Sequence, residues 1–240
     1  MVEIVAEISG NHDGSLLMAR ELIRGAAIAG CDYAKFQYYQ PDDMPDYAEH
    51  REMYEKLHVP SDWLSPLFET ARDCGIGLFA SVFSGRGAKE ILQYDTPFIK
   101  IASPGSTELD AEVYSDIESV IPRHVGLIVS SDSRHADKMW NWSFWGRPFK
   151  RMYCPPGHPQ RLIDEDYNFG WHHSIEAFSD HSKGISAPLS MIREFPATLR
   201  MIEKHFKLEY DRFQYENPCV DAAFSADPQT MWTLCRLAHN

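Results

Sequence analysis

The sequence predicts an α/β fold, a single (β/α)₈ barrel of the TIM type that takes residues 1–240 as one domain. Three observations lead to this prediction. Short β-type segments recur at nearly regular intervals, and helical patterns lie between most of them. The length of 240 residues also suits one barrel of roughly 250 residues. No linker or low-complexity tract divides the chain.

Eight segments have the composition of strands, which is the number that a closed barrel needs. They cover residues 2–8, 33–39, 77–82, 98–103, 125–130, 149–154, 175–181 and 201–206. Because these strands alternate with helical patterns, the sheet is expected to be parallel.

The expected helices cover residues 16–29, 63–74, 88–94, 109–120, 186–195 and 228–238. Gly30 and Gly75 are expected to end the first two helices, and Ser61 is the expected N-cap of the second. The connections 132–148 and 155–174 have weak helical patterns, so the helices around the fifth and sixth units are expected to be shortened.

Charge and composition exclude several classes of function. With 23 basic and 35 acidic residues the net charge is −12, which disfavours nucleic acids and anionic membrane surfaces as partners. No apolar run approaches the roughly 20 residues of a membrane span. The first residues carry Glu3 and no basic region, so no signal peptide is expected. Five cysteines form no CxxC pair, so a soluble cytoplasmic protein without a disulfide framework is expected.

The acidic residues after the second strand are expected to form a solvated loop without chemistry. They are Asp42, Asp43, Asp46 and Glu49.

Two lysines are expected at the mouth of the barrel. In a parallel barrel alternate strand residues face the lumen, and functional groups gather at the carboxyl ends of the strands. This places Lys35 and Gln37 of the second strand near Lys100 of the fourth. Either lysine alone could be a solvated strand residue, whereas the pair indicates a site for a phosphate or carboxylate dianion.

The last two strands bring two histidines to the same mouth. Strand seven ends in Ser179-Asp180-His181, and strand eight carries Glu203 and His205 on one side. A single histidine at a strand end is more often structural than a ligand. Two at adjacent strand ends, beside Glu203, indicate a metal site.

Five segments resemble the sialic acid synthase (N-acetylneuraminate synthase) family, in the order of that family and over essentially the whole chain. They are residues 6–14 (AEISGNHDG), 34–37 (AKFQ), 99–103 (IKIAS), 178–181 (FSDH) and 202–206 (IEKHF). The SDH and IEKHF segments are the most specific of the five. Asp221 and the Ser-Ala-Asp-Pro that follows it resemble a segment that begins Asp-His in the family.

The resemblance implies a TIM barrel that condenses phosphoenolpyruvate with an N-acylated amino-sugar aldehyde and releases phosphate. It implies His181 and His205 as ligands of a divalent metal, usually manganese. The residues implied to bind phosphoenolpyruvate are Lys35, Lys100, Ser103, Ser179 and, in place of a family threonine, Ser81. Those implied to handle the sugar and the proton transfers are Glu7, Gln37, Glu203 and Asp221.

The chain departs from the family around the sugar. Pro104-Gly105 replaces Gly-Glu, residues 157–159 read Gly-His-Pro in place of Asn-Tyr-Pro, and Ala222 replaces a histidine. The length leads us to expect no antifreeze-like C-terminal domain, which in the family supplies an arginine to the partner subunit's sugar site. These departures predict an acceptor other than ordinary N-acetylmannosamine, and a homodimer is a weaker expectation.

Two other functions stay open from the sequence. One is a barrel that binds a sugar or phosphorylated ligand without turnover, and the other is a different metal-dependent aldolase or isomerase. The metal is open as well, since two imidazoles with oxygen ligands suit manganese, cobalt or zinc, and magnesium remains an alternative.

Overall fold

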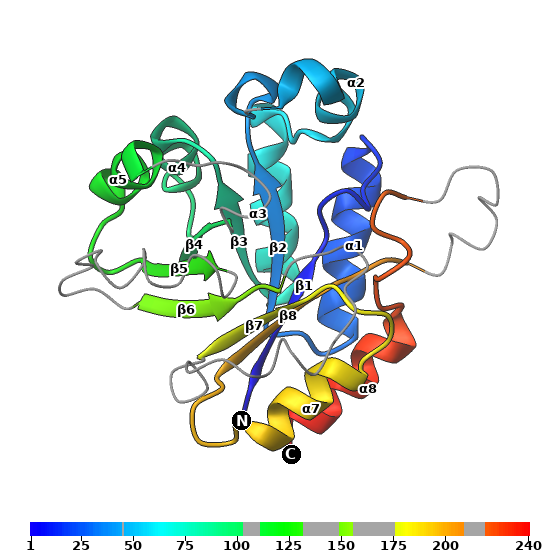
Figure 1. Cartoon of the computed structure of the whole chain (residues 1–240). Coiled ribbons are helices and arrows are strands. Elements are labelled where there is room, and N and C mark those ends of the chain that lie inside the picture. Colours follow the sequence, from blue (N-terminus) through cyan, green and yellow to red (C-terminus); the bar gives the residue numbers. More distant parts are fainter. Residues whose placement is uncertain (45, 103–110, 132–148, 156–175, 209–218) are drawn as a thin grey trace.

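The computed structural model describes residues 1–44, 46–102, 111–131, 149–155, 176–208 and 219–240. Eight parallel strands form a closed barrel in chain order, in which β8 pairs with β1 (Figure 1). The helices lie outside the ring of strands. The predicted fold class is therefore confirmed.

Every predicted strand is present, and its ends differ from the prediction by two residues at most. The strands are β1 (Glu3–Glu7), β2 (Tyr33–Tyr38), β3 (Gly77–Val82), β4 (Phe98–Ile101), β5 (Gly126–Ser131), β6 (Phe149–Tyr153), β7 (Ala177–Asp180) and β8 (Met201–His205).

The helices lie around this barrel. They are α1 (Leu16–Ile28), α2 (Tyr47–Leu57), α3 (Leu64–Cys74), α4 (Gly85–Ile91), α5 (Ala111–Val120), α7 (Ser186–Glu194) and α8 (Pro228–His239). Of these, α1, α3, α4, α7 and α8 each bury several residues. Gly75 ends α3 in the left-handed conformation, with φ +69°, as predicted. The helices expected to be shortened, within residues 132–148 and 155–174, lie outside the described residues apart from Pro155.

Two local predictions are wrong. The acidic segment is not a plain solvated loop, because Asp46 and Glu49 begin helix α2 and Asp43 lies in a 3₁₀ turn (Pro41–Asp43). Ser61 starts a second 3₁₀ turn (Ser61–Trp63) and does not cap α3, which follows Trp63 without a side-chain cap.

Helix α4 begins three residues before its predicted start. The hydroxyl of Ser84 accepts a hydrogen bond from the backbone N–H of Gly87, which caps the helix there. Gly85 is needed at the first position, because a Cβ there would lie 2.3 Å from a carboxylate oxygen of Asp116.

The lumen below the mouth is filled by apolar side chains. The buried cluster inside the barrel consists of Val5, Phe79, Ile128, Met152, Ala177 and Met201. Tyr33, Phe79 and Phe98 meet edge to face, with ring centroids 5.4 to 5.9 Å apart. Gly77 pairs with Tyr33 and Gly126 with Phe98, so each glycine leaves room for the ring beside it. The lumen is therefore a packed core with a polar mouth.

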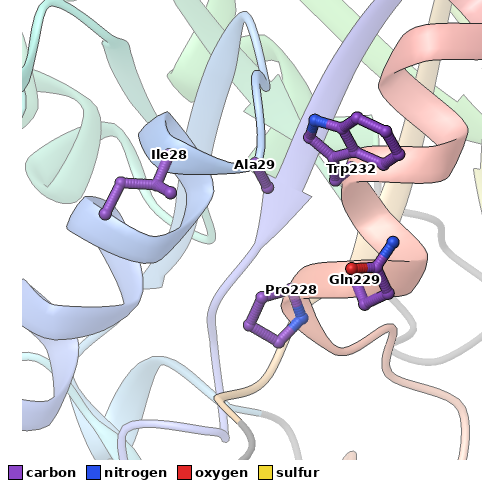
Figure 2. Close-up of a pocket in the computed structure, with 5 residues that line it drawn as sticks. All are labelled: Ile28, Ala29, Pro228, Gln229 and Trp232. Atoms are coloured by element: carbon purple, nitrogen blue, oxygen red, sulfur yellow. The ribbon is translucent and has the colours of Figure 1, made fainter.

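The chain ends meet on the side opposite the mouth, where the backbone N–H of Val2 donates to the carbonyl of Ala238. A cavity of about 290 Å³ lies between the end of α1 and the start of α8, lined by Ile28, Ala29, Pro228, Gln229 and Trp232 (Figure 2). This cavity belongs to the outer helical layer and contains none of the predicted site residues. Within the described part of the chain, no helix has the length and apolar character to cross a membrane.

The fit of Gly126 against Phe98 predicts that Gly126→Ala is destabilising. A Cβ on Gly126 would lie 2.3 Å from Phe98 Cδ1, and the aromatic contacts of Phe98 prevent an easy shift. We expect the free energy of unfolding in urea to fall by about 1–3 kcal/mol, as overpacking usually costs. Gly87→Ala is the matched control, since its Cβ would meet its nearest neighbour at 3.4 Å. Equal stability of the two variants would contradict the packing account.

Candidate active site

The strand register sets the polar mouth. Glu7 of β1 lies opposite Lys35 of β2, and Ser179 of β7 lies opposite Glu203 of β8. Each of these four residues lies two positions after a residue whose side chain packs in the lumen, so its own side chain points inward too. The inward side chains therefore change from apolar to charged or polar at the carboxyl ends of the strands. Sequence alternation therefore placed these residues correctly.

Lys35 is tied to three strands. Its ammonium group pairs with Glu7, donates to Ser81 Oγ at 2.9 Å, and lies 3.6 Å from Glu203 Oε2. The side chains of Lys35 and Glu7 are both 1% exposed. Burial lowers the pKa of Lys35, but Glu203 and Glu7 outweigh it, so the pKa lies above its ordinary value.

Glu203 crosses the lumen. Its two oxygens lie 2.7 and 2.9 Å from Lys100 Nζ on β4, and Ser179 Oγ donates to Oε1 at 2.9 Å. Burial on its own raises the pKa of Glu203, but Lys100 and Lys35 outweigh it and lower the pKa to about 2. The pKa of Lys100 is lowered, chiefly by burial and further by Lys35. At neutral pH Glu203 is thus a carboxylate and a hydrogen-bond acceptor.

Two inward residues of this level were missed by the sequence reasoning. Ser130 lies two residues after Ile128 on β5 and is buried. Among the described residues its Oγ has no hydrogen-bond partner. Cys154 follows Met152 at the end of β6, and burial raises the pKa of its thiol, with Lys100 opposing. The same alternation that selected Lys35 could have found both, because each lies two residues beyond a lumen-facing side chain.

Asp180 on β7 and Lys204 on β8 point away from the lumen and form a second ion pair. Asp180 lies opposite Lys204, and Lys204 Nζ is 2.6 Å from Asp180 Oδ2. Both side chains are fully buried. Lys204 also donates to the carbonyl of Ser182, whose N–H donates to Asp180 Oδ1 at 3.0 Å. This outer pair fixes the turn that carries His181.

His181 and His205 lie side by side at the mouth. Their ring centroids are 5.1 Å apart, and Phe224 lies edge-on to both, at 5.8 and 4.8 Å. Asp221 Oδ2 is 3.1 Å from His205 Nδ1, although the two atoms lack the alignment of a hydrogen bond. The predicted histidine pair is thus brought together, with Asp221 beside it.

These donors fit a divalent metal in part. Two neighbouring imidazoles and a carboxylate next to one ring nitrogen are a common arrangement at metal sites, where the carboxylate orients the histidine. Among the residues that the structure describes, no group of three histidine, cysteine, aspartate or glutamate side chains is placed to hold one ion. His181 and His205 would therefore supply two ligands, with water or substrate oxygens completing the shell.

The other predicted residues lie around this centre. Gln37 is half-buried on β2, and its backbone N–H donates to Ser9 Oγ; the N–H of Ser9 in turn donates to Glu7 Oε1 at 2.8 Å. Ser103 lies outside the described residues, as do Pro104-Gly105 and residues 157–159. Two of the three departures from the family thus fall on residues that are not described, and the changed acceptor stays a prediction.

Residues 22–130 match the family model described as the NeuB family. Over this stretch the chain is similar to the NeuB family. The matched stretch holds Lys35, Ser81 and Lys100, whereas the two histidines and Glu203 lie beyond it. The resemblance read from the five sequence segments is confirmed.

Similar curated proteins include two pseudaminic acid synthases. The chain is 29% identical to that of Campylobacter jejuni strain 81-176, over 87% of this chain and 66% of the relative. It is 29% identical to that of Helicobacter pylori, over 94% of this chain and 70% of the relative. The chain thus spans about two thirds of the length of these relatives.

A solved structure also shares the fold. The sialic acid synthetase of Leptospira borgpetersenii superposes with a TM-score of 0.80 at 23% identity, over 99% of this chain and 82% of that one. At this identity the match supports the barrel fold and says nothing of the substrate.

The outer ion pair predicts a strong coupling between Asp180 and Lys204. Lys204→Met leaves the Asp180 carboxylate buried without its cation, and we expect a loss of about 3–5 kcal/mol in the free energy of unfolding. The double variant Asp180→Asn/Lys204→Met removes both charges, so its loss should be smaller than that of Lys204→Met. Urea unfolding of both single variants and the double variant measures this coupling. Losses that simply add would contradict it.

Proposed function

We propose that this protein condenses phosphoenolpyruvate with an aldose or amino-sugar aldehyde, forming a nonulosonate-like 2-keto sugar acid and releasing phosphate. The observation that carries the proposal is the pair of buried lysines, Lys35 and Lys100, facing the same mouth as His181 and His205. The relatives named as pseudaminic acid synthases and as N-acetylneuraminate-9-phosphate synthases support a reaction of this type.

The lysines supply the attraction for an anionic substrate. In the free protein their ammonium groups bind Glu7 and Glu203, so these four charges cancel within the lumen. Phosphate and carboxylate oxygens of phosphoenolpyruvate would take over part of these hydrogen bonds, together with the hydroxyls of Ser81 and Ser179. Because the four lumen charges sum to zero, a divalent cation at the mouth would offset the charge of the substrate.

We assign that cation to His181 and His205. Manganese is the metal that we favour, with cobalt, zinc and magnesium as alternatives. When bound, it would polarise the aldehyde oxygen of the acceptor and so make the aldehyde carbon more electrophilic.

The protein's own groups would then direct bond formation. The methylene carbon of phosphoenolpyruvate attacks the aldehyde carbon, which forms the new C–C bond and leaves C2 electron-poor. Water adds to C2, and the C2–O bond to phosphate breaks with its electron pair leaving on phosphate. We assign Glu203 to accept the proton of the added water, since its carboxylate becomes a stronger base once phosphoenolpyruvate takes over the ammonium groups of Lys100 and Lys35. Glu7, Gln37 and Asp221 are the groups that we assign to the acceptor and to the remaining proton transfer.

Under this proposal the protein works in the cytoplasm on two small molecules, with neither nucleic acid nor membrane as a partner. A homodimer fits the proposal.

Phosphate release tests the proposal. With Mn²⁺, phosphoenolpyruvate and a panel of aldoses and N-acylated amino sugars, we expect phosphate to form only in the presence of a suitable acceptor. Lys35→Ala should lower kcat/KM about 100-fold, the usual cost of losing one preorganised charge-stabilising donor. Lys89→Ala, on the exposed face of α4, is the matched control and should leave the rate unchanged.

Two outcomes would contradict the proposal. Tight binding of phosphoenolpyruvate without turnover for any acceptor would indicate a binding barrel. Metal-dependent turnover of a sugar phosphate that is insensitive to Lys100→Ala would indicate a different aldolase or isomerase.

A further inference from the structure

Residues 219–226 return to the barrel mouth beside the end of β8. Ala226 forms an isolated parallel bridge with Phe206, in which its N–H donates to the carbonyl of His205 at 2.7 Å. The N–H of Lys207 in turn donates to the carbonyl of Ala226 at 3.0 Å. These two hydrogen bonds anchor residues 219–226 next to His205.

Asn11, in the turn after β1, ties the same segment to β8. Its Nδ2 donates to the carbonyl of Phe206 and to Ser225 Oγ, both at 2.8 Å. Ser225 Oγ donates to the carbonyl of Asp221 at 2.7 Å. Asn11 is buried, and since a carbonyl only accepts, its amide nitrogen is the atom that must face Phe206. An aspartate in its place would set one oxygen against another.

The same turn leaves room for the carboxylate of Asp221. Gly10 has φ +75°, and a Cβ on it would lie 2.7 Å from Asp221 Oδ2. That oxygen is also the one that lies 3.1 Å from His205 Nδ1. The turn after β1 therefore holds the backbone of Asp221 through Ser225, and Gly10 leaves the space that its carboxylate occupies.

We infer that Asn11 is a positioning residue for His205. Through Ser225 it places the Asp221 carboxylate against Nδ1 of His205 and so sets the orientation of the imidazole from outside the lumen. A carboxylate beside one ring nitrogen restricts the orientation of a metal-binding histidine, so that Nε2 is left for the metal. The inference deepens the proposed function, because metal binding by His181 and His205 is part of it.

Two variants test this chain of contacts from Asn11 through Ser225 to Asp221. Ser225→Ala removes only the hydroxyl, and Asn11→Asp keeps the size of the side chain but removes its donors. In crystal structures of both, we expect the contact between Asp221 Oδ2 and His205 Nδ1 to be lost. Titration with Mn²⁺, followed by electron paramagnetic resonance of the free ion, should show about 10-fold weaker binding, at the lower end of what such outer partners contribute.

Two controls separate positioning from general loss of stability. Ser225→Thr keeps the hydroxyl and should keep both the contact and the manganese affinity. Thr70→Ala also removes a buried hydroxyl, one that accepts from Arg20 at 2.9 Å and donates to the carbonyl of Pro66 at 2.7 Å on α3. It should leave manganese affinity unchanged.

The inference is overturned if Asp221 keeps its contact with His205 in both variants, or if the contact is lost and manganese affinity does not change. Failure of the proposed function looks different. A wild-type protein that binds Mn²⁺ but releases no phosphate would remove the reaction, while the crystal structures and the manganese titrations would still decide the role of Asn11.

Discussion

The carboxylate of Glu203 lies between the ammonium groups of Lys100 and Lys35, inside a lumen where all three side chains are almost fully buried. Taking such groups out of water costs several kcal/mol each, and only their mutual attraction and hydrogen bonds offset that cost. A barrel with apolar side chains at these positions would often be as stable. The charged level at the mouth is therefore better explained by ligand binding than by packing.

The rest of the mouth is arranged around this level by strand alternation. On β7 and β8 the inward residues are Ser179 and Glu203. The next residue of each strand, Asp180 or Lys204, points to the other face, and these two form a buried ion pair. The inner face of these two strands thus carries the hydrogen bond from Ser179 to Glu203, and the outer face carries an ion pair. The outer pair holds the turn with His181, and the turn after β1 holds Asp221 beside His205, so the histidines are fixed from two sides of the barrel.

Much of this arrangement could be predicted from the sequence. Period-2 alternation and strand ends are local signals, and they predict Lys35, Lys100, Glu203 and the histidines at one mouth. The pairing of Lys100 with Glu203 could not be read in this way, because it joins strands 103 residues apart across a closed barrel. Whether a lysine such as Lys100 has a carboxylate partner depends on how the barrel closes, which the local sequence does not show.

Helix α2 was not predicted from the sequence, for a different reason. It buries only Leu57, so it lacks the apolar periodicity that marks a helix. Local polar contacts accompany it, among them Tyr54 donating to Asp46 at 2.7 Å and Arg51 over the Tyr47 ring at 5.1 Å. Ser130 and Cys154 were missed because a small polar residue in an apolar strand carries no signal of its own; only its position relative to Ile128 or Met152 does.

The central claim is that the lysine pair and the histidine pair form one site. Crystals soaked with Mn²⁺ and phosphoenolpyruvate test it most directly. We predict one ion within bonding distance of both His181 and His205, and phosphoenolpyruvate oxygens about 3 Å from Nζ of Lys35 and Lys100. An ion held elsewhere, or phosphoenolpyruvate bound away from these lysines, would contradict the account.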